Sequence, residues 1–252
     1  MAASDTHAQD TVLASAGCGA ALASALAALL AIFGHRWGWW DSHAEFIVMR
    51  SAAWAGVFAT LISFYALNAA RRANSQRAKK IGILGVIVGV LAFGLPAFQQ
   101  VEGPTAPLIH DITTDTGNPP RFVAILPLRK DAPNISVYGG PDVAAEQKAG
   151  YPDLAPLDLA MPTRAAFDLA LNVARASGWE IVAAVPEENR IEATATTLLF
   201  RFKDDVVIRI TPTATGSRVD IRSVSRVGLG DLGANANRIR GFLRQLAAAK
   251  SG

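Results

Sequence analysis

Side chains that could recognise an anion gather near the end of the chain. Residues 201–252 contain 10 Lys and Arg against 4 Asp and Glu. A guanidinium presents a planar fork of N–H donors, so a concave surface of arginines could bind a carboxylate, a phosphate or a lipid headgroup bidentately. The alternative is a ladder of cross-strand ion pairs, which sheets use at small net gain. The candidate ligand-binding residues of this cluster are Asp205, Arg209, Asp220, Arg222, Ser223, Ser225, Arg226, Asp231, Asn235 and Arg238.

A second kind of chemistry would centre on His110 and its neighbour Asp111, which complete the set of candidate binding residues. A hydrolase could use the imidazole as a general base for Ser223 or Ser225, or pair it with an Asp of the cluster. The sequence contains no nucleophile elbow, no H-E-x-x-H motif and no P-loop. A structural histidine is therefore favoured over a catalytic one, and we assign no catalytic residue, no metal site and no cofactor.

A G-x-G-x-x-G pattern occurs at Gly228, Gly230 and Gly233, between a predicted strand and a predicted helix. In a dinucleotide-binding fold this motif needs a following parallel strand and an acidic residue about 20 positions later, and neither follows Gly233. The favoured interpretation is a tight turn in which glycine supplies positive φ angles. Anion binding by backbone N–H groups at the helix start is the alternative.

The elements that must position these side chains lie in residues 160–252. One apolar face predicts a helix over 163–177, and a second helix follows Asp231. Between them, β-rich runs at 179–185, 190–202, 205–212 and 217–227 are separated by connections short enough for hairpins. The order α-β-β-β-β-α predicts an α+β domain: a four-stranded antiparallel sheet with helices packed on one face.

The last two predicted strands carry most of the candidate site. A four-residue turn at 214–217 would pair residue 213 with residue 218 and place Asp205 opposite Arg226 and Arg209 opposite Arg222. These charged side chains would share one face of the sheet, and Ile208, Ile210, Val219, Ile221 and Ser223 would share the other, toward the helices. A shift of one residue would reverse this pattern.

Residues 101–159 are rich in Pro, Gly and Asp and show little periodicity. They also contain scattered apolar side chains, such as Ile112, Phe122 and Tyr151. We expect an irregular segment that wraps around the domain and packs on it.

The first hundred residues have the composition of a membrane domain. The chain has a mean hydropathy of +0.26 and only 18% charged residues, and its single cysteine excludes a disulfide framework. Uncharged stretches of about the 20 residues that a bilayer requires predict three transmembrane helices, at about 11–33, 46–70 and 81–98. A cleaved signal peptide is disfavoured, because the first ten residues contain no Lys or Arg.

The loops between the spans predict the orientation. Residues 71–80 contain five Lys and Arg, whereas the loop after the first span has Arg36 alone, balanced by Asp41 and Glu45. Because positive loops stay on the cytoplasmic side, we expect a multi-pass protein of the bacterial inner membrane. Its N-terminus would be cytoplasmic and residues 101–252 periplasmic.

Charge distribution restricts the partners. The formal net charge of +3 lies wholly in residues 1–100, and residues 101–252 are neutral, which disfavours nucleic acid. The expected partners are the lipid bilayer and either an anionic ligand or an envelope protein. Small residues in the first and third spans would permit a homo-oligomer.

Several motifs give the chain a family resemblance. IHDITTDTGNPP (109–120), GWEIV (178–182), FRFKDDVVIRI (200–210) and VDIRSVSRVGLGDLGANANRIRGFL (219–243) resemble the bacterial family known as domain of unknown function number 1499. The similarity covers residues from about 104 to 248. The family's motif positions match at His110, Asp111 and the ten cluster residues. Members that resemble this chain often carry N-terminal membrane spans, and the resemblance implies no activity.

Three functions remain in competition. The leading hypothesis is a non-catalytic inner-membrane protein whose periplasmic domain binds a partner or an anionic ligand in the cell envelope. The first alternative is the envelope hydrolase based on His110. The second is a purely structural domain that serves oligomerisation.

Overall fold

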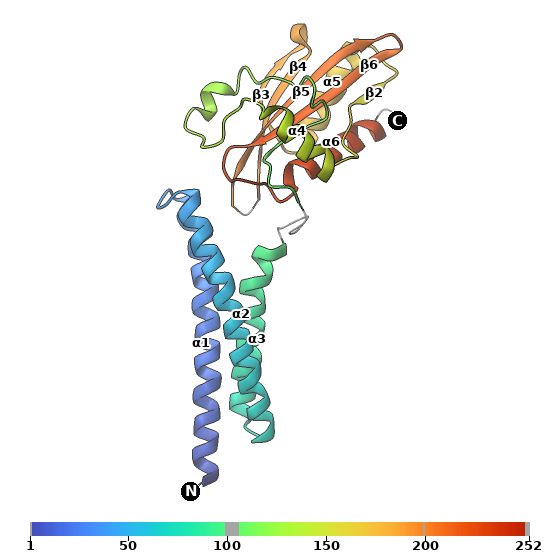
Figure 1. Ribbon diagram of the computed structural model, residues 1–252. Coiled ribbons are helices and arrows are strands. Elements are labelled where there is room, and N and C mark those ends of the chain that lie inside the picture. The colour runs from blue at the N-terminus through green and yellow to red at the C-terminus, as the bar shows by residue number, and fades with distance from the viewer. Residues whose placement is uncertain (1, 99–105, 199, 250–252) are drawn as a thin grey trace. The chain divides into compact units, whose positions relative to one another are not determined.

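The computed structural model describes residues 2–98, 106–198 and 200–249, without the side chains of residues 2–7, 42 and 95–98 (Figure 1). The chain forms two compact units, residues 1–100 and residues 101–252. The first unit is helical, and the second combines a sheet with helices. The predicted order, helices followed by an antiparallel α+β domain, is confirmed.

The first unit is a bundle of α1 (Ala2–Arg36), α2 (Ser42–Arg72) and α3 (Gln76–Phe98). Small residues allow the helices to approach closely. A Cβ added at Gly17 would lie 2.7 Å from Ser63 Oγ, and one added at Gly56 would lie 3.2 Å from the carbonyl oxygen of Gly89. Gly17 and Gly56 therefore pack against neighbouring helices of the same chain.

Two of these helices are long and apolar enough to cross a membrane, Ala8–Arg36 and His43–Arg72. The prediction of three spans is corrected to two on this criterion. The third predicted span, 81–98, is helical within α3, but its last residues lie outside the described side chains. The uncharged residues 81–94 that remain are fewer than the roughly 20 that a bilayer requires.

The second unit is built on one antiparallel sheet whose long strands, β5 (Lys203–Thr213) and β6 (Gly216–Ser225), lie at its centre (Figure 1). Next to β5 come β4 (Arg190–Thr196) and β3 (Glu180–Val185), joined by a short 3₁₀ helix, η3 (Pro186–Glu188). On the other side, β6 pairs with two short strands, β1 (Asp111–Thr113) and β2 (Leu157–Leu159). The four predicted strands therefore form the greater part of the sheet.

The sheet has six strands, so the prediction of four strands is wrong: it missed β1 and β2. Both come from residues 101–159, which also contain 3₁₀ helix η2 (Leu126–Arg129) and helix α4 (Gly140–Gly150). A strand of three residues is too short to produce a recognisable alternation in sequence. These strands form because the free edge of β6 offers backbone N–H and C=O groups that need partners.

The register of the central hairpin differs from the predicted one by two residues. Thr213 pairs with Gly216, so Asp205 lies opposite Val224 and Arg209 lies opposite Asp220. The turn contains two residues, Ala214 and Thr215, instead of four. Because side chains alternate with a period of two, this shift preserves the predicted faces while changing every cross-strand neighbour.

One face of the sheet packs against α5 (Thr163–Ala176) and α6 (Ala234–Ala249), close to their predicted positions. Ile208, Ile210, Val219 and Ile221 are buried there, as predicted. On the same core the ring of Trp179 stacks on Phe242 with a centroid distance of 5.4 Å. Each fully buried aliphatic or aromatic side chain of this kind contributes about 1.5–3 kcal/mol, so this face is the domain's hydrophobic core.

Gly216 begins β6 at the point where β2 lies against it. A Cβ added at Gly216 would overlap the carbonyl oxygen of Leu159 and lie 2.9 Å from the backbone nitrogen of Met161. We therefore expect Gly216→Ala to destabilise the domain by about 1–3 kcal/mol, because backbone atoms must move. Hydrogen exchange of the β2 and β6 amides measures this change.

Gly241 gives the matched control. It lies within α6, and a Cβ there meets nothing within 4 Å. Alanine favours a helix interior over glycine, so Gly241→Ala is expected to stabilise the domain by about 0.5–1 kcal/mol. Equal effects of the two substitutions would contradict the close contact between β2 and β6.

Candidate functional site

The sheet separates the predicted cluster into two groups on opposite faces. Ser223 and Ser225 project toward α6, and their alternating neighbours on β6 project to the other face. That second face is covered by residues 114–138, here called the strap. The face under the strap contains Asp111, Asp205, Arg209, Asp220, Arg222 and Arg226. The side facing α6 contains Ser223, Ser225, Asn235 and Arg238, with His110 and Asp231 in the adjoining loops.

Arg222 forms the innermost link between the sheet and the strap. Its guanidinium donates to both carboxylate oxygens of Asp111, at 2.8 and 2.6 Å, and to the carbonyl oxygens of Pro120 and Ser136. The side chain is 3% exposed, and its guanidinium lies 5.2 Å from the centroid of the Phe122 ring. All of these groups belong to the protein, so Arg222 holds the strap instead of presenting its charge to solvent.

Asp205 is the centre of a second buried group. Its carboxylate, with 0% side-chain exposure, accepts from Arg129 at 3.1 Å, from Arg226 at 2.9 and 2.8 Å and from Thr194 Oγ1 at 2.9 Å. Burial lowers the pKa of Arg129, with Asp205 opposing that shift. Arg129 in turn donates to the carbonyl oxygen of Asn134. One carboxylate thus ties together β4, β5, the end of β6 and the strap.

Arg209 lies nearer the surface and links two acidic residues. It donates to Asp220 on the neighbouring strand and to Asp115 of the strap, both at 3.0 Å, and to the carbonyl oxygen of Asn118 at 2.9 Å. Asp220 is buried, whereas Arg209 keeps 23% of its side chain exposed. The ion-pair interpretation thus accounts for each arginine of the face under the strap.

Glu192 completes this face and was not among the predicted residues. Its buried carboxylate accepts hydrogen bonds of 2.9–3.1 Å from the backbone N–H groups of Val123, Ala124 and Ile125, and pairs with Arg190. These donors precede η2, so the carboxylate satisfies backbone groups that would otherwise be unpaired. The sequence did contain a signal for this buried carboxylate, because Glu192 lies inside the largely uncharged run IEATAT.

Residues beneath α6 form a separate hydrogen-bond network. Asn235 Nδ2 donates to Ser225 Oγ at 2.9 Å and to the carbonyl oxygen of His110, and Ser223 Oγ donates to Asn235 Oδ1 at 2.6 Å. Arg238 donates to Ser223 Oγ and to Asp204. Ser223 and Asn235 are 0% exposed. This network fixes α6 to the sheet.

The His110 imidazole lies outside that network. Its Nδ1 is 3.3 Å from the carbonyl oxygen of Leu229, and within the described residues no hydrogen bond joins the ring to Ser223 or Ser225. A general base must come within hydrogen-bond reach of its nucleophile. The hydrolase hypothesis therefore gains no support from this geometry.

The glycine-rich turn before α6 is closed by Asp231. Its carboxylate accepts from the backbone N–H groups of Gly233 at 3.0 Å and Asn235 at 2.7 Å, and burial raises its pKa. Gly228 and Gly233 have φ angles of +96° and +84°. The favoured interpretation, a tight turn that needs glycine, agrees with these angles. The N–H groups considered for an anion are occupied by the protein's own carboxylate.

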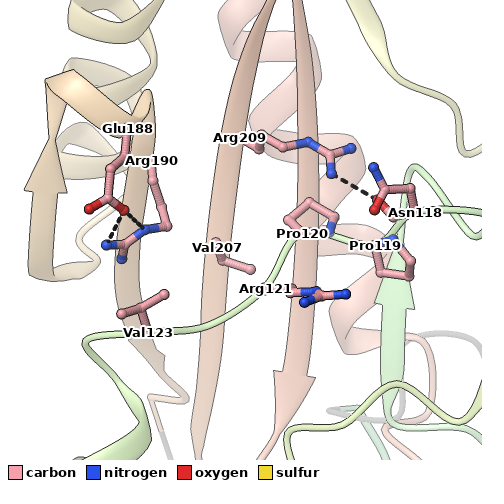
Figure 2. A pocket seen from close by; sticks show the side chains of 9 residues that line it. All are labelled: Asn118, Pro119, Pro120, Arg121, Val123, Glu188, Arg190, Val207 and Arg209. Atoms are coloured by element: carbon pink, nitrogen blue, oxygen red, sulfur yellow. Dashed lines mark hydrogen bonds and ion pairs between the residues drawn. The ribbon is translucent and has the colours of Figure 1, made fainter.

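Two cavities open where the strap crosses the sheet. The first, of about 290 Å³, is drawn in Figure 2. Arg190 is paired with Glu188 there and Arg209 with Asn118, whereas Arg121 has no dashed line. Arg121 is exposed and makes no hydrogen bond or ion pair with the described part of the chain. The residues that line the first cavity are Asn118, Pro119, Pro120, Arg121, Val123, Glu188, Arg190, Val207 and Arg209.

The second cavity, of about 480 Å³, shares Arg121 with the first and extends to Leu126 and Tyr138. The Tyr138 hydroxyl is buried without a hydrogen-bond partner among the described residues, and burial raises its pKa to about 12. Arg121 therefore lines both cavities, and the second is also lined by Tyr138, whose hydroxyl makes no hydrogen bond with the described residues. Sequence reasoning missed Arg121, although its place after two prolines, which favour an extended rigid backbone, was a signal.

No group of three or more His, Cys, Asp and Glu side chains in the described residues is arranged to hold a metal ion. Residues 111–246 match the family model described as "Protein of unknown function (DUF1499)". No curated protein matches the chain.

Proposed function

We propose that the α+β domain of this chain, which belongs to the DUF1499 family of proteins of unknown function, binds one anionic group at Arg121. The ligand chemistry is a carboxylate or a phosphate presented at the surface of the strap. The proposed role is binding: Glu188, the carboxylate in the first cavity, is paired with Arg190, and the hydroxyl side chain of Ser136 lines the second cavity.

A single observation carries this proposal: Arg121 is the unpaired arginine beside a cavity. Arg190 and Arg209 line the same cavity but are neutralised. Arg190 is paired with Glu188 and Glu192. Arg209 is paired with Asp115 and Asp220. The guanidinium of Arg121 has no carboxylate partner among the described residues. An unpaired guanidinium that lines two cavities can take a planar anion bidentately.

The proposed setting is the cell envelope. The basic loop between α2 and α3 and the two candidate spans support a membrane anchor. If α3 also crosses the bilayer, the N-terminus is cytoplasmic and residues 101–252 are periplasmic. The anion would then belong to an envelope component, either a soluble metabolite or a group on another envelope protein.

Binding of small anions to the full-length protein in detergent tests the proposal. Inorganic phosphate and glycerol 3-phosphate represent the phosphate ligands, and N-acetylmuramic acid represents the carboxylate ligands. At a concentration about 100 times its dissociation constant, a bound anion is expected to stabilise the domain by about 2.7 kcal/mol, seen as a higher unfolding temperature. The Arg121→Gln variant should lose this shift while keeping the same unfolding temperature without ligand.

Arg175→Gln is the matched control, since Arg175 is an exposed arginine on α5, remote from the strap in sequence. It should retain the full shift. A shift that survives Arg121→Gln, or the absence of a shift with all three anions, would overturn the assignment of Arg121 and favour a purely structural domain.

A further inference from the structure

Four loops meet at one end of the sheet, where β4 and β6 end and β5 and β1 begin (Figure 1). Their described residues are 106–110, 126–137, 197–198, 200–202 and 226–233, here called the loop end. Hydrogen bonds connect them: Arg226 N donates to the carbonyl oxygen of Lys203, and Asp231 N donates to that of Ile109. Arg226 Nη1 also donates to the carbonyl oxygen of Leu128. The loop end is therefore one continuous surface.

Large aliphatic side chains project from this surface. Leu198 is 90% exposed and Leu229 is 79% exposed, and each is at the tip of a loop. Within the described part of the domain, every exposed large hydrophobic residue lies in the loop end or the strap. The turns at the opposite end, 186–189 and 213–216, contain none. The further exposed aliphatic side chains of the loop end are Leu108, Leu126, Leu128, Ile135, Val137 and Leu232.

Exposed cations accompany these aliphatic side chains. Lys130, Arg201 and Lys203 are exposed on the same loops, with Asp131 as the exposed acidic neighbour. Apolar tips beside basic residues are the combination that binds the interface of an anionic bilayer. The aliphatic groups enter the boundary between headgroups and acyl chains, while the cations meet lipid phosphates.

We propose that the loop end docks on the anionic phospholipid surface of the leaflet to which the chain is anchored. This inference rests on the membrane anchor of the proposed function. Residues 99–105 are all that separates the end of α3 from the described start of the domain. Since an extended chain spans at most about 3.3–3.6 Å per residue, Leu108, ten residues after Phe98, stays within roughly 36 Å of that helix end.

Lipid is favoured over a second copy of the chain by charge. A symmetric dimer through the loop end would bring Lys130, Arg201 and Lys203 of both copies together, because an isologous interface pairs a surface with itself. Like charges in such a contact oppose association. An anionic leaflet is complementary to them instead.

Lipid quenching of site-specific fluorophores tests the docking in the full-length protein. Cys18 is the only cysteine, so a Cys18→Ala background accepts single labels at Leu198→Cys and Leu229→Cys. The protein is placed in nanodiscs of phosphatidylcholine with phosphatidylglycerol, with and without brominated lipid. Two further labels calibrate the signal: Leu61→Cys on the exposed side of α2 and Ala214→Cys in the β5–β6 turn.

Quenching at Leu198 and Leu229 is expected to approach that at Leu61 and to exceed that at Ala214 several-fold. It should fall toward the Ala214 level in Arg201→Glu/Lys203→Glu or in phosphatidylcholine alone. If Leu61 is quenched but the two loop labels are not, the docking is wrong and the anchor stands. If the Leu61 label is not quenched either, both the membrane anchor and the docking of the loop end are wrong. A blue shift without lipid quenching means that a protein covers the loop end, which also overturns the proposal.

Discussion

Replacing Asp205 with alanine is expected to lower the free energy of unfolding of the α+β domain by about 3–5 kcal/mol. The carboxylate is fully buried and is the charged partner of both Arg129 and Arg226. Removing it leaves the guanidinium of Arg129, 3% exposed, as an uncompensated charge in the interior. Hydrogen exchange of the β5 and β6 amides in the full-length protein measures the loss, since these central strands report global opening.

An exposed pair with the same chemistry provides the control. Asp158 accepts from Arg218 at 2.8 and 2.9 Å, but their side chains are 61% and 48% exposed. Asp158→Ala should leave stability almost unchanged, because solvent screens such pairs. The Asp205 effect should also shrink in an Arg129→Met background, where one stranded charge is absent. An undiminished effect would show that Asp205 is not coupled to Arg129.

Replacing Glu192 with alanine is expected to release the strap and to destabilise the domain by about 3 kcal/mol. Three backbone N–H groups lose their acceptor, and each buried donor left unpaired costs about 1–3 kcal/mol before relaxation. Trypsin should then cleave after Arg121 faster than in the unmodified protein. The cavities beside Arg121 should be lost together with the strap, so anion binding should disappear.

The Glu192→Gln variant keeps a hydrogen-bond acceptor at this position but removes the negative charge. The amide oxygen can still accept from the strap, so this variant should be intermediate in cleavage rate. Glu180→Ala, on the exposed side of β3, should leave cleavage unchanged. If Glu192→Ala leaves the strap as resistant as Glu180→Ala does, the hydrogen bonds to residues 123–125 do not hold it.

The parts of the fold that sequence predicts are those that rest on long periodic patterns. The helix after Pro162 and the strands β3–β6 each contain enough residues for a face to be recognised. The faces of the central hairpin were right although the register was wrong, since an error of two residues keeps every side chain on its side. The strands β1 and β2 had no such pattern, because β6 creates them by pairing.

The candidate site was less accessible from sequence for a similar reason. Alternation on β5 and β6 identified Asp205, Arg209 and Arg222 as clustered charges, but the groups that neutralise them come from distant segments. Asp111 precedes Arg222 by 111 residues, and Arg129 precedes Asp205 by 76. Whether an arginine faces solvent or a carboxylate depends on where the strap lies. Arg121 is the candidate because Arg190 and Arg209, which line the same cavity, are paired.

The position of β6 affects how the domain is made. This strand pairs with β5 and also with β1 and β2, yet it follows all three along the chain and is synthesised after them. At synthesis rates of about 5–20 residues per second, the segment from β1 to α5 exists for several seconds before its partner is translated. Contacts so distant along the chain close slowly. The early half of the domain must therefore be shielded from misassociation until its C-terminal strand arrives.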